Sequence, residues 1–193
     1  MGISVFVTVV AACLHGVAYF LYCVQAKRGA SKPNPAALLI WVILSVVNAA
    51  NLTALSDWVA SLQFITGSVA TMMMFVFVLF VGKLAPLKKK EWGYVALALV
   101  AIIVRVKLGD RNGAMLASFI ILLTGIISVI PIVQGLLESP SNEPFVPWLL
   151  WTVAFLLTAL SRYSQKGLDG MAVLSVIYAF LHGCIAVLTR RKA

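Results

Sequence analysis

Charged residues are scarce in this chain, and their scarcity excludes an ordinary soluble domain. Asp, Glu, Lys and Arg make up only 11% of the 193 residues, whereas soluble domains carry roughly 25%. Hydrophobic residues make up 62% of the chain, and the mean hydropathy is +1.04. Several apolar stretches reach the ~20 residues that a helix needs to cross a bilayer core. The composition predicts an all-α integral membrane protein.

Cysteine and acidic residues are also few. Cys13, Cys23 and Cys184 all fall within apolar segments, where a thiol behaves as a small hydrophobe, so no disulfide framework is indicated. The N-terminus lacks a basic region, which argues against a cleaved signal peptide. The six acidic residues lie in loops or at segment ends; they are Asp57, Glu91, Asp110, Glu138, Glu143 and Asp169. Because ion coupling usually depends on an intramembrane carboxylate, we expect no pump or symporter.

Basic residues dominate, and they cluster. The net charge is +9, and the clusters are Lys27 to Lys32, Lys83 to Lys90 and Arg190 to Lys192. Clusters between apolar segments are typical of a cytoplasmic membrane surface, so we expect contact with membrane lipid and no nucleic-acid partner. With seven spans, this bias predicts an exterior N-terminus and a cytoplasmic C-terminus, in a bacterial inner membrane.

Seven apolar segments can be drawn along the chain, at about 3–26, 36–56, 59–82, 92–108, 113–137, 146–163 and 168–189. The fourth segment is the weakest span, because Arg105 and Lys107 come early at its end. It could lie on the cytoplasmic surface, but long basic side chains near a helix end can snorkel. We therefore prefer seven transmembrane helices.

A pattern repeats in the two halves of the chain. Gly, Gln, Pro and Trp occur at 16, 25, 35 and 41, and again at 125, 134, 144 and 151. The first three pairs share one spacing, and the Trp pair needs one inserted residue. Such a repeat predicts two related three-helix bundles, 1–83 and 112–193, joined by a linker with the fourth helix, 84–111.

This 3+1+3 pattern with repeated prolines resembles the class that contains PQ-loop proteins, SWEET sugar transporters and PnuC-type vitamin-precursor transporters. In SWEETs, prolines on the first two helices of each repeat form hinges near the cytoplasmic gate. The resemblance implies that role for Pro131 on the fifth segment, for Pro144 or Pro147 on the sixth, and for Pro33 or Pro35 on the second.

The last third of the chain looks most like PnuC. Trp148-Leu149-Leu150-Trp151 matches the Trp-x-x-Trp motif of that family's sixth helix, and Lys166-Gly167-Leu168 follows at a suitable distance. In that family the tryptophans help to form an aromatic pocket for a nicotinamide or related nucleoside. The resemblance implies a pocket role for Trp148 and Trp151, although an interfacial aromatic belt also explains tryptophans at a segment start.

Asn48 and Asn51 are the most costly residues to place in a membrane. They lie three residues apart on one helix face, and Asn48 is near mid-depth. An amide in hydrocarbon must find partners or face a cavity. Hydrogen bonds between helices and contact with a solute both remain open for this pair.

His15 and His182 both occur as Leu-His-Gly, on the first and last segments, at comparable depth. Packing or pocket lining is the favoured interpretation, with haem ligation or proton relay as alternatives. Tyr19 and Tyr178 are further pocket candidates.

These features predict a membrane facilitator of a small, neutral solute that resembles a nucleoside, vitamin or sugar. Such a protein would alternate access between its two bundles without a cofactor or metal. The alternative is a non-transporting protein of the same fold that acts as a receptor, chaperone or assembly subunit. No catalytic constellation is apparent, so we expect no enzyme. Association into homo-oligomers is left open.

Overall fold

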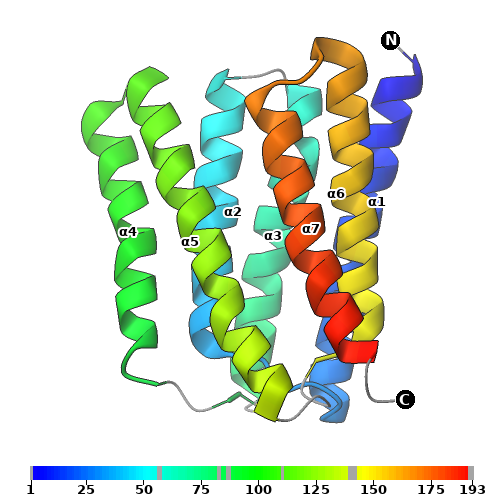
Figure 1. The fold of residues 1–193 in the computed structure, drawn as a ribbon, viewed down its shortest axis with the longest axis vertical. Helices are drawn as coiled ribbons and strands as arrows, with labels where there is room; N and C mark the ends of the chain where they lie inside the picture. The colour runs from blue at the N-terminus through cyan, green and yellow to red at the C-terminus, as the bar shows by residue number, and fades with distance from the viewer. Residues whose placement is uncertain are drawn as a thin grey trace.

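The computed structural model describes residues 2–55, 58–81, 84–85, 88–109, 111–138 and 143–190. Within these ranges the chain is all helical, as the composition predicted, and forms seven helices (Figure 1). They are α1 (Gly2–Arg28), α2 (Pro35–Leu55), α3 (Trp58–Val81), α4 (Glu91–Leu108), α5 (Arg111–Glu138), α6 (Phe145–Lys166) and α7 (Gly170–Arg190). Each lies over one of the seven apolar segments.

Polar side chains explain where several helices begin. The Asn34 side chain accepts a hydrogen bond from the Ala37 amide at 3.0 Å, and Pro35 follows at the first helical position, where its missing N–H costs nothing. The Asp169 carboxylate accepts from the Ala172 amide at 2.9 Å at the start of α7. These caps satisfy amides that have no partner within the helix.

Five helices are long and apolar enough to cross a membrane: α1, α3, α5, α6 and α7. A shorter apolar stretch, Pro35–Asn51, lies in α2. In α4, Glu91, Arg105 and Lys107 leave fewer apolar residues. Many large apolar side chains point outward, among them Phe6 and Phe80. Since exposed apolar surface on this scale needs an apolar solvent, the chain is a membrane protein.

Six of the seven helices, all except α4, form a ring. Around this ring α6 contacts α1, α1 contacts α3, α3 contacts α2, α2 contacts α5, α5 contacts α7 and α7 contacts α6. The fourth helix, α4, packs outside this ring against α2 and α5, and it lies at the edge of the bundle in Figure 1. α1 begins at one end of the bundle, and α7 ends at the opposite end (Figure 1).

Aromatic and small residues fill the centre of the ring. The largest buried cluster contains Tyr19, Tyr22, Trp148 and Trp151 together with alanines of α1, α2 and α7. The alanines let helices approach closely, and the aromatic rings of α1, α2 and α6 fill the space between these helices. This packing surrounds the candidate site.

Candidate functional site

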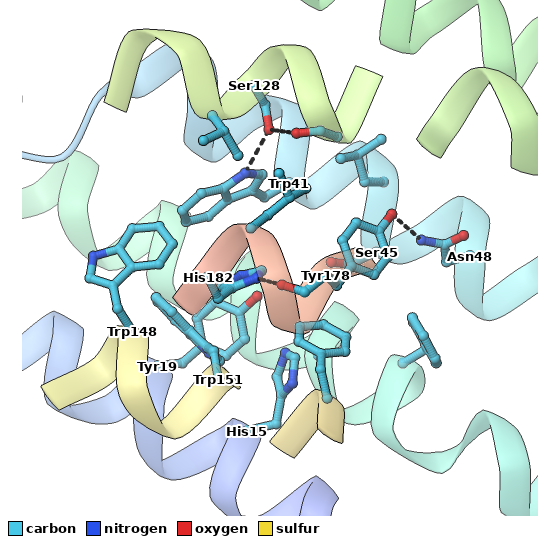
Figure 2. Close-up of a pocket in the computed structure, with 17 residues that line it drawn as sticks. His15, Tyr19, Trp41, Ser45, Asn48, Ser128, Trp148, Trp151, Tyr178 and His182 are labelled. Atoms are coloured by element: carbon cyan, nitrogen blue, oxygen red, sulfur yellow. Dashed lines mark hydrogen bonds between the residues drawn. The ribbon is translucent and has the colours of Figure 1, made fainter. Parts of the chain in front are cut away.

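An internal pocket lies inside the ring (Figure 2). The centres of water molecules can occupy about 70 Å³ of this pocket. That volume holds several waters. Every helix except α4 contributes to its lining. The lining residues are His15, Tyr19, Trp41, Leu44, Ser45, Asn48, Phe64, Gly67, Gly125, Ser128, Val129, Trp148, Trp151, Phe155, Tyr178, Leu181 and His182.

Seven of the eight residues predicted to bind a solute line this one pocket; they are His15, Tyr19, Asn48, Trp148, Trp151, Tyr178 and His182. The eighth, Asn51, lies elsewhere, where its amide donates to the Ser118 hydroxyl at 3.0 Å. One turn of α2 therefore separates an asparagine at the pocket from an asparagine that joins α2 to α5.

Trp151 is the centre of the aromatic wall. Its ring centroid lies 4.9 Å from that of Tyr19, 5.0 Å from Trp148 and 6.0 Å from Trp41. These are edge-to-face arrangements, which aromatic rings prefer over direct stacking. Trp148 is fully buried, so its environment differs from that of an interfacial belt residue such as Trp92, which is 57% exposed.

Both histidines contact Phe155, with ring centroids 5.1 Å (His15) and 5.2 Å (His182) from the centroid of that ring. Gln63 contacts His15 Nδ1 through its amide nitrogen at 2.9 Å; an amide nitrogen only donates, so Nδ1 accepts and Nε2 carries the hydrogen. His182 Nδ1 lies 2.6 Å from the Tyr178 carbonyl oxygen, which only accepts, so Nε2 keeps its lone pair. Neutral imidazoles in these tautomers offer one donor and one acceptor.

Polar contacts across the pocket join helices from both halves of the chain. The Asn48 amide of α2 donates to the Tyr178 hydroxyl of α7 at 3.3 Å. The Trp41 indole N–H of α2 donates to the Ser128 hydroxyl of α5 at 3.1 Å, and that hydroxyl donates to the Gly125 carbonyl. Figure 2 shows these side chains converging on one space.

One hydrogen-bond donor in the wall has no partner. Trp151 is 1% exposed, and its indole Nε1 has no hydrogen-bond acceptor among the described residues. Leaving a buried N–H unsatisfied costs roughly 1–3 kcal/mol. An acceptor on a bound molecule, or a water, would remove that cost.

The four predicted hinge prolines sit at helix starts or inside a helix. Pro131 is buried within α5, where its ring cannot donate to the Ile127 carbonyl, so a bend is favoured there. Pro35 and Pro147 lie in the first turns of α2 and α6, and Pro144 is the extended residue before α6.

Glu143 is a buried acidic residue that sequence reasoning placed in a loop. It is 7% exposed, and its carboxyl accepts from the Tyr22 hydroxyl at 3.0 and 3.1 Å and from the Trp148 indole N–H at 3.1 Å. Burial is the main cause that raises the pKa of Glu143 to about 8, although these two donors lower it. We call Glu143, Tyr22 and Trp148 the Glu143 cluster.

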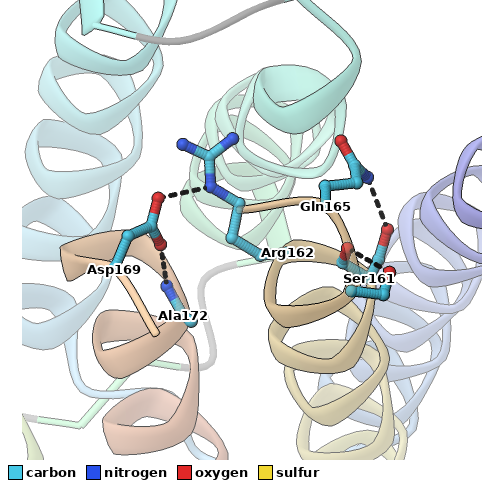
Figure 3. A network of polar contacts seen from close by, with 6 residues as sticks. Ser161, Arg162, Gln165, Asp169 and Ala172 are labelled. Atoms are coloured by element: carbon cyan, nitrogen blue, oxygen red, sulfur yellow. Dashed lines mark hydrogen bonds and ion pairs between the residues drawn. The ribbon is translucent and has the colours of Figure 1, made fainter. Parts of the chain in front are cut away.

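A second polar network lies at the opposite end of α6 (Figure 3). Arg162 pairs with Asp169 through Nε at 2.7 Å. Next to it, the Ser161 hydroxyl lies 2.9 Å from the Thr8 hydroxyl of α1 and accepts from the Gln165 amide. We call Thr8, Ser161, Arg162, Gln165 and Asp169 the Arg162 cluster; it ties together α1, α6 and α7.

Sequence reasoning did not assign ten of the seventeen lining residues to a site, among them Trp41, Ser128 and Phe155. Trp41 marked the repeat, but it was not assigned to the site. Ser128 and Phe155 carried no signal, because serine and phenylalanine are common in membrane helices. Their position depends on which helices are neighbours in the ring.

Fold and site together define an all-helical membrane protein with an aromatic pocket inside a ring of six helices, and none of the described residues that line it is Asp, Glu, Lys or Arg. No protein-family model, curated protein or solved structure matches this chain.

Proposed function

We propose that this protein is a membrane facilitator that carries a small, neutral solute through the aromatic pocket. The observation that supports this most is the lining itself, which draws on six helices and omits α4. A site at the centre of two bundles is what a transporter built from repeats requires.

The lining favours a neutral solute with a ring. Among the described residues that line the pocket there is no Asp, Glu, Lys or Arg. The wall instead offers aromatic faces, one imidazole N–H, one imidazole lone pair and the unpartnered Trp151 N–H. Nucleoside-, vitamin- and sugar-like molecules carry rings with both donors and acceptors, so they fit this chemistry.

The proposed motion is alternating access between two three-helix halves. The first half would be α1, α2 and α3 (1–83), the linker would carry α4 (84–111), and the second half would be α5, α6 and α7 (112–193). In the ring, α1 meets α6 and α2 meets α5, so rocking at these two seams would open the pocket to either side. We place the N-terminus outside and the C-terminus in the cytoplasm of a bacterial inner membrane, from the basic clusters.

The experiment is a thermal-shift screen of the purified protein with uridine, pyridoxine and glucose, followed by uptake of any stabilising solute into proteoliposomes. A ligand that binds the folded state raises its stability by mass action. Trp151→Phe removes the N–H but keeps a ring, and should weaken binding about tenfold, which is about 1.4 kcal/mol.

Trp92→Phe is the matched control, because Trp92 is exposed on α4 and should leave binding unchanged. Equal binding by the two variants would contradict the proposed site. Binding without uptake would favour the non-transporting alternative.

A further inference from the structure

We propose that Glu143 is a proton-binding site whose occupancy is linked to closure of the pocket at the end where α1 ends and α6 begins. The carrier would then move a proton together with its solute, in place of the uncoupled movement that the sequence predicted. The coupling to a solute rests on the proposed transport function. The proton-linked closure does not, and it can be measured without any solute.

The Glu143 cluster lies directly beyond the pocket. Tyr22 is one turn past Tyr19 on α1, and Trp148 is one turn before Trp151 on α6; the Tyr22 ring contacts both tryptophans, with centroids 6.5 and 5.7 Å away. Glu143 accepts from Tyr22 and Trp148, and so joins α1 to α6. Opening this end requires these hydrogen bonds to break.

The charges around Glu143 do not neutralise it. The described part of the chain holds two ion pairs, Lys88 with Glu138 and Arg162 with Asp169, and Glu143 is in neither. Both of its hydrogen-bond donors, a phenol and an indole, are uncharged. A buried carboxylate without a cation is costly, so the closed end favours the protonated form.

Other titratable and charged groups occur on the elements around Glu143. They are Tyr22, Cys23, Lys27 and Arg28 on α1, Lys32 in the loop after α1, Glu138 on α5, and His182 and Arg190 on α7. Lys27, Arg28 and Arg190 are exposed, and the Arg190 guanidinium lies 4.8 Å from the Phe145 ring centroid. Exposed cations are screened by water and salt.

The direction of the linkage follows from these surroundings. When the end opens, the Glu143 carboxyl meets water, where glutamate has a pKa of about 4.3; when it closes, burial raises that pKa to about 8. Closing therefore takes up one proton from water, and opening returns it. The ratio of closed to open protein should therefore rise as pH falls. Between about pH 8 and about pH 4.3, this ratio should rise by at most about tenfold per pH unit.

The test is a tryptophan-fluorescence pH titration of the full-length protein, because Trp148 contacts the carboxyl directly. We expect a transition centred near pH 8 in the wild type that disappears in Glu143→Gln. Glu138→Gln is the matched control, since Glu138 is exposed and should leave the transition in place. A transition that persists in Glu143→Gln, or that is removed by His182→Gln, would overturn the proposal, as would a wild type that shows no transition.

Glu143→Asp covers the case in which the glutamine variant does not fold. Its shorter side chain cannot hold the same contacts with Tyr22 and Trp148, so its midpoint must move; an unmoved midpoint contradicts the proposal. Uptake assays test proton coupling and the proposed transport function separately. Uptake that ignores a pH gradient contradicts proton coupling alone, whereas a Glu143-dependent transition without uptake contradicts the transport function alone.

Discussion

At its two ends, α6 is joined to the neighbouring helices by different interactions: an ion pair at one end, and hydrogen bonds to an unpaired carboxyl at the other. At the Arg162 cluster, a buried guanidinium is paired with a carboxylate that also caps α7, so each charge has an opposite charge. At the Glu143 cluster, a buried carboxyl has only a phenol and an indole as donors. The first arrangement joins two opposite charges. The second depends on whether the carboxyl carries a proton, so the end with Glu143 is the better candidate for a part that opens.

The largest effect is expected at the Arg162 cluster. Asp169→Ala removes the partner of a buried arginine and the cap of α7. Breaking a fully buried pair costs roughly 3–5 kcal/mol, but the Asp169 side chain is 28% exposed, so we expect a loss of about 2 kcal/mol. Thermal unfolding in detergent measures it.

Asp169→Asn is the control for that substitution, because its side-chain oxygen can still cap α7 while the charge is lost. It should be destabilised about half as much. An Asp169→Ala variant that unfolds at the wild-type temperature would show that this end is not held by the ion pair.

A smaller effect is expected at the other end, and it should depend on pH. The folded-state pKa of Glu143 lies above its unfolded value, so the stability that the proton supplies is complete below about pH 4.3 and is lost as pH rises through about 8. The wild type should therefore unfold more easily at pH 9 than at pH 6, while Glu143→Gln should show a flatter profile. Parallel profiles for the two proteins would contradict this assignment.

The smallest effect is expected from the surface pair on the same side as Glu143. Lys88 and Glu138 lie 3.5 Å apart, with side chains 48% and 68% exposed. Exposed pairs contribute little, so Lys88→Ala should change stability by less than about 0.5 kcal/mol at any pH. A larger change would mean that charge in general, rather than burial of one carboxyl, controls this end.

The comparison also shows what the sequence could predict. Long apolar runs predicted where each helix lies, because membrane helices are defined by composition over ~20 residues. Costly polar residues such as Asn48 and His15 pointed to the pocket for a similar reason: an amide or imidazole in an apolar segment needs a partner or a cavity.

Burial at helix ends could not be predicted in the same way. Glu143 and Asp169 both look like loop acids in the sequence, yet one meets Tyr22 across 121 positions and the other meets a buried arginine seven residues away. Asn51 shares a helix face with Asn48, but only Asn48 lines the pocket. The face is wide enough for the Asn51 side chain to reach α5 instead. These outcomes depend on which helices become neighbours.

The most direct test of alternating access needs no knowledge of the solute. Ser45 lines the pocket from α2, and Ser45→Cys can be placed in a chain whose Cys13, Cys23 and Cys184 are replaced by serine. A membrane-impermeant maleimide is then applied to either side of proteoliposomes that hold the protein in one orientation. If the pocket opens alternately, Cys at this position is labelled from both sides, and the cysteine-free chain from neither. Labelling from a single side, or from no side, would contradict transport through this pocket.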